Sequence, residues 1–328
     1  MPGASVVLDP KNQWFLDFLK QLNRPQVFEV PLEQARAMHE RGQELFPLPK
    51  LPARVEERTI QCGPKGSIGI KIIRPENVSA DLPVIMYFHG GGWVLGSFQT
   101  YDLFIRQLVN GTGAALVFVE YSLSPEEHYP VALEECYAAT RWVSENSAVL
   151  QLDTSRIVLA GDSAGGNLTA AACLLAKERG GPRIVGQTLI YPATGASFDT
   201  PSFHEFGQGY YLTAEGSRWF WHQYAPDRSA DHDPHACPLV ASLEQLTGLP
   251  PALIITGECD VLRDEGEAYA RKLMQAGVSV ACTRYLGVIH GFIGINALAE
   301  SEPARAAVAQ ITDWIRQRLG ASNAAAAV

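Results

Sequence analysis

The stretch Gly161-Asp162-Ser163-Ala164-Gly165-Gly166-Asn167 decides the fold of this chain. It follows the apolar run Ile157-Val158-Leu159-Ala160 and precedes a small-residue, helix-forming run at 168–176. This order predicts a strand, an abrupt turn with a serine at its apex, and a helix. The glycines on either side of the serine let the strand and the helix approach closely, and the Ala164 N–H sits at a helix N-terminus, where it favours negative charge. The pattern is common on its own, so a nucleophilic role for Ser163 depends on further motifs.

The composition is that of a globular protein with one large α/β domain or two ordinary ones. The chain has 328 residues, of which 47% are hydrophobic and 19% charged;. Its formal net charge is −9 and no basic patch is visible, which argues against a nucleic-acid partner;. No run approaches the roughly 18 apolar residues of a membrane span, and the N-terminus lacks a signal-peptide pattern. We expect a cytoplasmic protein without a membrane span, and a homodimer is compatible with the sequence.

The cysteines and histidines show no metal-binding pattern. The six cysteines are scattered without a C-x-x-C pair, so we expect buried, reduced thiols;. His232-Asp233-Pro234-His235 resembles a metal pair, but its proline breaks the helix that would bring both rings to one face;. We therefore expect no metal and no other cofactor.

The chain divides into a helical start, an alternating main part and one insertion. Apolar residues recur with helical spacing in 9–22 and 31–46, so residues 1–50 are predicted to be helices that precede the main fold. Residues 51–193 and 248–320 alternate strand-like and helix-like runs, which indicates a mostly parallel sheet flanked by helices. The predicted strands are residues 57–62, 68–73, 84–88, 114–120, 157–160, 187–191, 252–256 and 280–286, and the predicted helices of this part are about 100–111, 130–146, 164–179, 264–276 and 302–319.

The insertion at 194–247 contains no clear strand and is rich in aromatic residues. We expect a helical excursion over the carboxyl ends of the strands, where open α/β sheets bind ligands. A helix pair that packs only on its own aromatic side chains is the alternative. The tail at 321–328 is of low complexity and is predicted to be flexible.

A glycine run forms the second motif. His89-Gly90-Gly91-Gly92-Trp93 follows the predicted strand 84–88, and consecutive glycines there allow a ligand to approach the backbone;. The N–H groups of Gly90 and Gly91, with that of Ala164, could form an oxyanion hole. We expect His89 to fix the loop by hydrogen bonding, and Trp93 to lie either in the core or on the wall of the site.

The base and its orienting acid would follow two later strands. Asp260 comes at the exit of the strand 252–256, and His290 follows the strand 280–286. The order serine, acid, histidine is that of an α/β-hydrolase triad. Glu258 is the alternative acid, because it lies two residues earlier on the same strand. Asp264 opens a helix and is better explained as complementing the helix dipole.

Together these motifs resemble the hormone-sensitive-lipase-like family of α/β-hydrolase esterases. The resemblance rests on the glycine run, the serine turn, Asp260-Val261-Leu262-Arg263-Asp264-Glu265-Gly266 and His290-Gly291-Phe292, and it covers about residues 55–320. It implies an α/β-hydrolase fold with an eight-stranded, mostly parallel sheet. It also implies a helical cap built from the N-terminal segment and from an insertion after the sixth strand.

Carried over by position, the family implies a catalytic function. Ser163 resembles the nucleophile, His290 the base and Asp260 its orienter. The family often has arginine where Ser122 stands and proline where Val261 stands, and neither change touches a catalytic group. The residues expected to contact substrate are Trp93, Tyr191, Phe206, Tyr211 and Phe292.

The hypothesis from the sequence is a carboxylesterase that acts on small-molecule esters with short acyl chains through an acyl-enzyme. An amidase or formamidase is an alternative, because ester and amide hydrolysis share this triad. A non-catalytic receptor is a second alternative; the receptors that resemble this family have lost the catalytic histidine, whereas His290 is present here.

Overall fold

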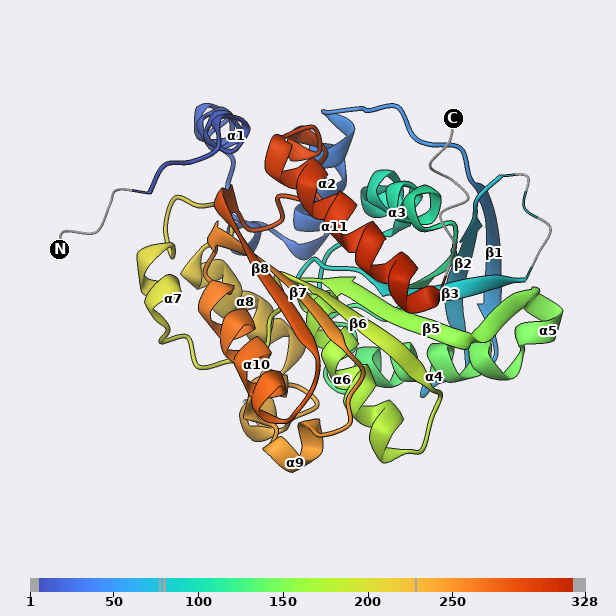
Figure 1. The fold of residues 1–328 in the computed structure, drawn as a ribbon. Helices are drawn as coiled ribbons and strands as arrows, with labels where there is room; N and C mark the ends of the chain where they lie inside the picture. The colour runs from blue at the N-terminus through green and yellow to red at the C-terminus, as the bar shows by residue number, and fades with distance from the viewer. Residues whose placement is uncertain (1–5, 77, 79–80, 228, 321–328) are drawn as a thin grey trace.

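The computed structural model describes residues 6–76, 78, 81–227 and 229–320, so the predicted tail at 321–328 lies outside the described residues. Its centre is an eight-stranded sheet with the strand order β1-β2-β4-β3-β5-β6-β7-β8 (Figure 1). The strands are β1 Arg54–Ile60, β2 Ile68–Arg74, β3 Leu82–Phe88, β4 Ala115–Glu120, β5 Leu152–Asp162, β6 Ile184–Ile190, β7 Ala252–Cys259 and β8 Val280–Ile289.

The pairing of the strands confirms the predicted α/β fold. The pairs β1–β2 and β2–β4 are antiparallel, and all the other neighbouring strands in the sheet are parallel. β5 begins five residues before its predicted start at 157, because Leu152 and Asp153 pair with the first residues of β3 before the ladder shifts register. The four residues 153–156 that follow Leu152 are polar and at least partly exposed, which is why hydrophobicity alone did not reveal this part of the strand.

Helices cover both faces of the sheet. α3 (Phe98–Thr112) and α11 (Glu302–Leu319) lie on one face, and α4 (Val131–Glu145), α6 (Ala164–Glu178) and α10 (Arg263–Gln275) lie on the other (Figure 1). Every residue of β3 is buried as a result, as expected for a strand covered on both faces;. None of the helices in the described part of the chain has the length and apolar character that a membrane crossing requires.

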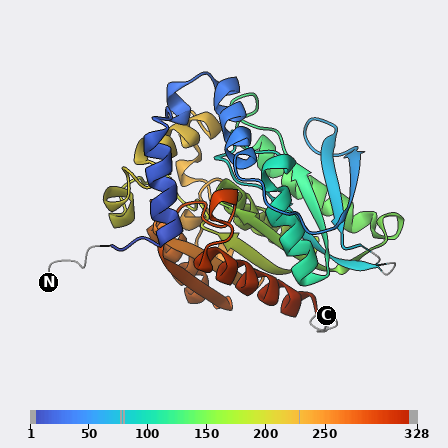
Figure 2. The same ribbon diagram turned by 90° about the horizontal axis from the view of Figure 1, so that it is seen from above.

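The N-terminal segment and the insertion lie next to each other above the carboxyl ends of the strands. Figure 2 shows α1 and α2 beside α8, and the short helix η1 contacts α8 directly. Asp9 caps α1 by accepting hydrogen bonds from the N–H groups of Lys11 and Asn12, and Pro10 is the first helical residue;. The remaining elements are α1 Pro10–Gln21, η1 Val27–Glu29, α2 Leu32–Glu44, α5 Ser147–Leu150, α7 Pro201–Glu205, α8 Ala214–Tyr224, η2 Ser229–His232, η3 Pro238–Val240, α9 Leu243–Leu246 and η4 Asn296–Leu298.

The glycine run is packed against both of these segments. Val94 and Leu95, just after the run, are buried in a small apolar cluster with Ala35 of α2 and Phe220 of α8. Arg36 of α2 donates from Nε to the Val94 carbonyl at 2.9 Å and also pairs with Glu126 through both terminal nitrogens. The segments above the sheet are therefore anchored to the loop that was predicted to bind an anion.

The cysteines are free, as expected, but not all of them are buried. Cys136, Cys173, Cys237 and Cys259 lie in the core, whereas Cys282 is exposed on β8. β8 is an edge strand with one unpaired side, so its residues reach solvent more easily than those of the central strands;.

Candidate active site

The turn at Ser163 has the geometry that its sequence predicts. Ser163 has a φ of +54° between β5 and α6, an uncommon conformation for a residue with a side chain;. A methyl group on Gly165 would lie 1.9 Å from the Phe88 carbonyl oxygen, and one on Gly161 would lie 2.3 Å from the Gly165 carbonyl oxygen. Only glycine fits at both positions, and the close packing holds the serine at the apex of the turn.

Three side chains that follow separate strands form a hydrogen-bonded chain. Nδ1 of His290 lies 2.7 Å from Oδ2 of Asp260, and Nε2 of His290 lies 2.9 Å from Oγ of Ser163. A carboxylate can only accept, so Nδ1–H donates to Asp260 and Nε2 is left to accept the serine proton. Oδ1 of Asp260 accepts from the Leu262 N–H at 2.9 Å, which orients the carboxylate. All three side chains are buried.

The competing acids are bonded elsewhere. Glu258 accepts from the Gly287 N–H at 2.7 Å through Oε2. Asp264 accepts from the Ser202 N–H at 2.7 Å and so joins α10 to α7. The structure therefore brings Asp260, and neither alternative, to His290.

The glycine run lies at the site, but Gly90 does not have the position that the sequence predicted for it. The Gly90 N–H donates to Oδ1 of Asp162 at 2.8 Å, so it is not free to bind a ligand, and the predicted oxyanion role does not suit it. Gly91 and Gly92 line the cavity instead, and within the described residues their N–H groups have no protein acceptor. Their φ values of +102° and +63° show why glycine stands at both positions;.

Asp162, next to the candidate nucleophile, holds this loop in place. Its carboxylate accepts from the Tyr87 hydroxyl at 2.7 Å and the Tyr101 hydroxyl at 3.0 Å, in addition to Gly90. Burial raises the pKa of Asp162 above its ordinary value, and these three donors act against that shift by favouring the charged form;. The side chain thus connects the serine turn to the glycine run.

His89 has the structural role that the sequence predicted. Its Nδ1–H donates to the Gly90 carbonyl at 2.7 Å, and its ring stacks on Tyr121 with a centroid separation of 4.3 Å. Burial lowers the pKa of His89 to about 4, so the ring is neutral near neutral pH. The ring supports the loop and is not among the side chains that line the cavity described below.

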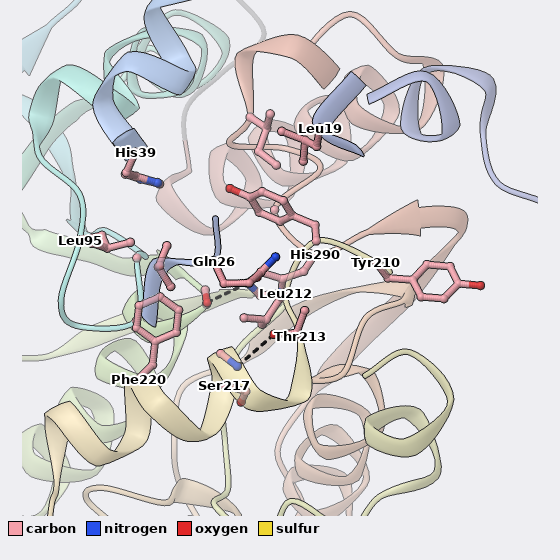
Figure 3. Close-up of a pocket in the computed structure, with 18 of the residues that line it drawn as sticks. Leu19, Gln26, His39, Leu95, Tyr210, Leu212, Thr213, Ser217, Phe220 and His290 are labelled. Atoms are coloured by element: carbon pink, nitrogen blue, oxygen red, sulfur yellow. Dashed lines mark hydrogen bonds between the residues drawn. The ribbon is translucent and has the colours of Figure 1, made fainter. Parts of the chain in front are cut away.

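A cavity of about 800 Å³ lies above the Ser163–His290 pair. Of the five side chains expected to contact substrate, Trp93, Tyr191 and Tyr211 line it. Figure 3 shows His290 among the lining side chains, with Phe220 and Leu212 nearby, while Tyr210 points away from the group.

The other two predicted contacts, Phe206 and Phe292, are not on the cavity wall. The Phe206 ring packs edge-on against Tyr210 and under the Arg263 guanidinium. Phe292 is fully buried, with its ring centroid 5.9 Å from that of Tyr191. Both rings lie one layer behind the wall. Phe292 packs against Tyr191, which does line the cavity.

Known proteins share this fold. A family model described as the alpha/beta hydrolase fold matches residues 85–294. Carboxylesterase NlhH of Mycobacterium tuberculosis is 42% identical over 247 residues, which cover 75% of this chain and 77% of the relative. The chain belongs to the hormone-sensitive-lipase-like family of α/β-hydrolase esterases. Ethyl acetate hydrolase of Pseudomonas putida is a further relative, 35% identical over 77% of this chain and 79% of its own length.

The likeness to other esterases of this family extends to three dimensions. A thermostable esterase from Pseudomonas putida superposes with a TM-score of 0.94 at 44% identity, covering 97% of this chain and 99% of that one. The present esterase is thus a carboxylic ester hydrolase, and a small-molecule ester is its substrate.

Several residues at the site of this esterase were not identified from the sequence. Gly92 could have been found, since it continues the glycine run, and so could Asp162, since it adjoins the serine. Arg24 and His39, which line the cavity from the N-terminal segment, carry no motif. The sequence predicted helices there but not which side chains they turn toward the site.

Proposed function

We propose that this esterase hydrolyses its substrate through Ser163, His290 and Asp260 by way of a covalent acyl-enzyme. Ser163 Oγ attacks the ester carbonyl carbon while His290 Nε2 takes the hydroxyl proton. The tetrahedral intermediate collapses, the bond to the alcohol oxygen breaks, and His290 returns the proton to the departing alcohol. Water then attacks the acyl-serine by the same route and releases the acid. The observation that carries this proposal is the hydrogen-bonded chain from Ser163 to Asp260.

The negative charge on the carbonyl oxygen would be stabilised by backbone N–H groups. We assign this role to Gly91, Gly92 and Ala164, because the first two lie free on the cavity wall and the third begins α6. A single such donor is typically worth ~3 kcal/mol in the transition state. Asp162 would support them indirectly by fixing Gly90.

We propose that residues 1–50 and 194–247 form a cap over this site and that the site favours short acyl chains. Trp93 and Trp221 are buried side chains on the wall, with ring centroids 4.7 Å apart, and Tyr191 lies beside His290. Each added methylene gains about 0.8 kcal/mol while there is room. Pressing a longer chain against such a wall costs about 1–3 kcal/mol.

Kinetics of single variants test the assignment of roles. Ser163→Ala and His290→Ala should each lower kcat on p-nitrophenyl acetate by ~10⁴-fold or more, and Asp260→Asn somewhat less. Glu258→Gln is the matched control for Asp260→Asn, and we expect it to change mainly the stability of the protein rather than kcat. If Ser163→Ala keeps a tenth of the activity, or Glu258→Gln is worse than Asp260→Asn, the assignment is wrong.

The dependence of kcat/KM on acyl length tests the size limit. A series of p-nitrophenyl esters should show a rise over the first few carbons and then a fall. A rise that continues through long chains, or activation by an emulsified triglyceride, would contradict the proposed wall and indicate a cap that opens at lipid surfaces.

A further inference from the structure

The cavity has two chemically different ends. Aromatic side chains are part of the wall near Ser163, whereas the end formed by α1, η1 and α2 combines apolar side chains such as Leu16, Leu19 and Val27 with many hydrogen-bonding ones. Asn23 and Gln26 are exposed there, which places the mouth of the cavity at this end. The polar or charged side chains of this end are Gln13, Asp17, Lys20, Asn23, Arg24, Gln26, His39 and Gln43. A simple alkyl ester has no group that would use them.

The formal charges at this end are mainly positive and are not neutralised by the protein. Lys20 and Arg24 line the cavity, and neither has a carboxylate within 4.0 Å among the residues that the structure describes. Nη2 of Arg24 donates to the Met38 carbonyl at 2.7 Å. Asp17 is the acidic side chain of this end, and its Oδ1 accepts from Gln13 at 3.1 Å. The mouth is thus locally cationic although the whole chain carries a net charge of −9.

His39 adds an unused hydrogen-bonding atom. Its Nε2 is buried and has no partner within the described part of the chain. Figure 3 shows the ring projecting from α2 toward the cavity, on the side of Leu95. Burial is the main cause and the nearby Arg24 charge the second cause of the lowered pKa of His39, which is about 4, so the ring is neutral rather than a second cation;. In one of its two neutral tautomers Nε2 carries the proton and can donate to a ligand. A buried polar atom without a partner is unfavourable and is usually satisfied by water or a ligand.

We propose that the esterase acts on esters that also carry a free carboxylate, which is held by Arg24 and by Nε2–H of His39 while the ester group lies at Ser163. This proposal rests on the proposed function of Ser163. A planar carboxylate suits a guanidinium, which offers paired donors, and its remaining lone pairs can accept from one neutral imidazole. Lys20 at the exposed rim would attract such substrates without being needed for their final position.

The test is a pair of substrates that differ only in charge. Monoethyl esters of succinic, glutaric and adipic acids are compared with the corresponding ethyl esters in which the free acid is a carboxamide. For at least one chain length, the wild-type kcat/KM should favour the acid at least about tenfold, which is near the lower limit for one hydrogen bond to a charged group. Added NaCl should lower kcat/KM for the acid and leave the amide nearly unchanged.

Substitutions then assign the effect to residues. Arg24→Gln and His39→Phe should each lower the acid-to-amide ratio toward one. Arg41→Gln is the matched control, because Arg41 belongs to α2 but does not line the cavity, and it should leave the ratio unchanged. The free diacid should inhibit the wild type competitively and the Arg24→Gln variant more weakly.

Each outcome decides the question. A wild-type ratio that stays below about tenfold at all three lengths, with the amides still hydrolysed, overturns the inference and leaves the proposed function intact. A high ratio that Arg24→Gln does not lower also overturns it. If Ser163→Ala retains full activity on these esters, the proposed function fails and this inference fails with it.

Discussion

Replacing Asp162 with asparagine should damage the site without touching a reacting atom. The carboxylate accepts three hydrogen bonds, from the Tyr87 and Tyr101 hydroxyls and from the Gly90 N–H. Asparagine has nearly the same shape but only one accepting oxygen, and its NH₂ group must face at least one of these donors. Oδ1 accepts from Gly90 and Tyr87 and Oδ2 from Tyr101, so the NH₂ group would take the place of Oδ2 and donate to the Tyr101 hydroxyl, which can rotate to accept. The Gly90 N–H would then bond to a neutral carbonyl oxygen instead of a carboxylate, which is a weaker acceptor.

The size of the effect follows from this count. A hydrogen bond to a charged group contributes about 1.5–3 kcal/mol, and reorientation of the hydroxyls recovers part of the loss, so we expect the free energy of unfolding to fall by about 2–4 kcal/mol. Loss of one oxyanion donor costs ~10²–10³ in kcat. Because the weaker Gly90 bond would loosen Gly91 and Gly92 rather than remove them, kcat should fall by roughly 10-fold, with little change in KM.

The assay is steady-state hydrolysis of p-nitrophenyl acetate together with urea unfolding. Tyr101→Phe is the matched control, since it removes one donor and leaves the carboxylate bonded to the Gly90 N–H, and it should cost about 1.5–3 kcal/mol of stability and little activity. A kcat for Asp162→Asn within twofold of the wild type, measured on folded protein, would refute the claim that Asp162 positions the glycine run.

Two further predictions concern close packing and pH. Gly92→Ala places a methyl group 2.1 Å from Cδ1 of Phe220, so we expect at least about a tenfold loss of kcat;. The double variant Gly92→Ala/Phe220→Ala should recover part of the lost kcat. No recovery would show that Phe220 is not the obstacle. Burial raises the pKa of Glu265 from 4.5 to about 8, so its contribution to stability is fully present below pH 4.5 and is lost as pH rises through about 8;. The loss is up to about 1.4 kcal/mol per pH unit. Glu265→Gln should flatten this part of the profile in urea unfolding, and an unchanged slope would contradict the shift.

The fold could be predicted in most of its detail because its signals are local. The strand and helix around Ser163 are visible in consecutive residues, and the order of serine, acid and histidine follows from strand ends that share one sheet edge. The start of β5 was missed because Leu152 and Asp153 pair with β3 through the backbone while their neighbours are polar. Such pairing leaves no hydrophobic pattern.

The finer site could not be predicted because it depends on contacts between distant segments. The sequence does not reveal that Gly90 donates to Asp162, 72 residues away, and this contact moves the free N–H groups one residue along the run. Phe206 and Tyr211 belong to one aromatic insertion, yet only Tyr211 lines the cavity. The packing of α2 on Val94 and Leu95 likewise determines that His39 faces the cavity.

The central claim is that Ser163 becomes acylated during turnover. The most direct measurement is rapid quenching of the reaction with p-nitrophenyl acetate, followed by peptide mass spectrometry of the wild type, Ser163→Ala and His290→Ala. We expect a burst of p-nitrophenol and an acetyl group on the peptide that contains Ser163 in the wild type, and neither in the two variants. An acetyl group on another residue, or turnover by Ser163→Ala at the wild-type rate, would contradict it.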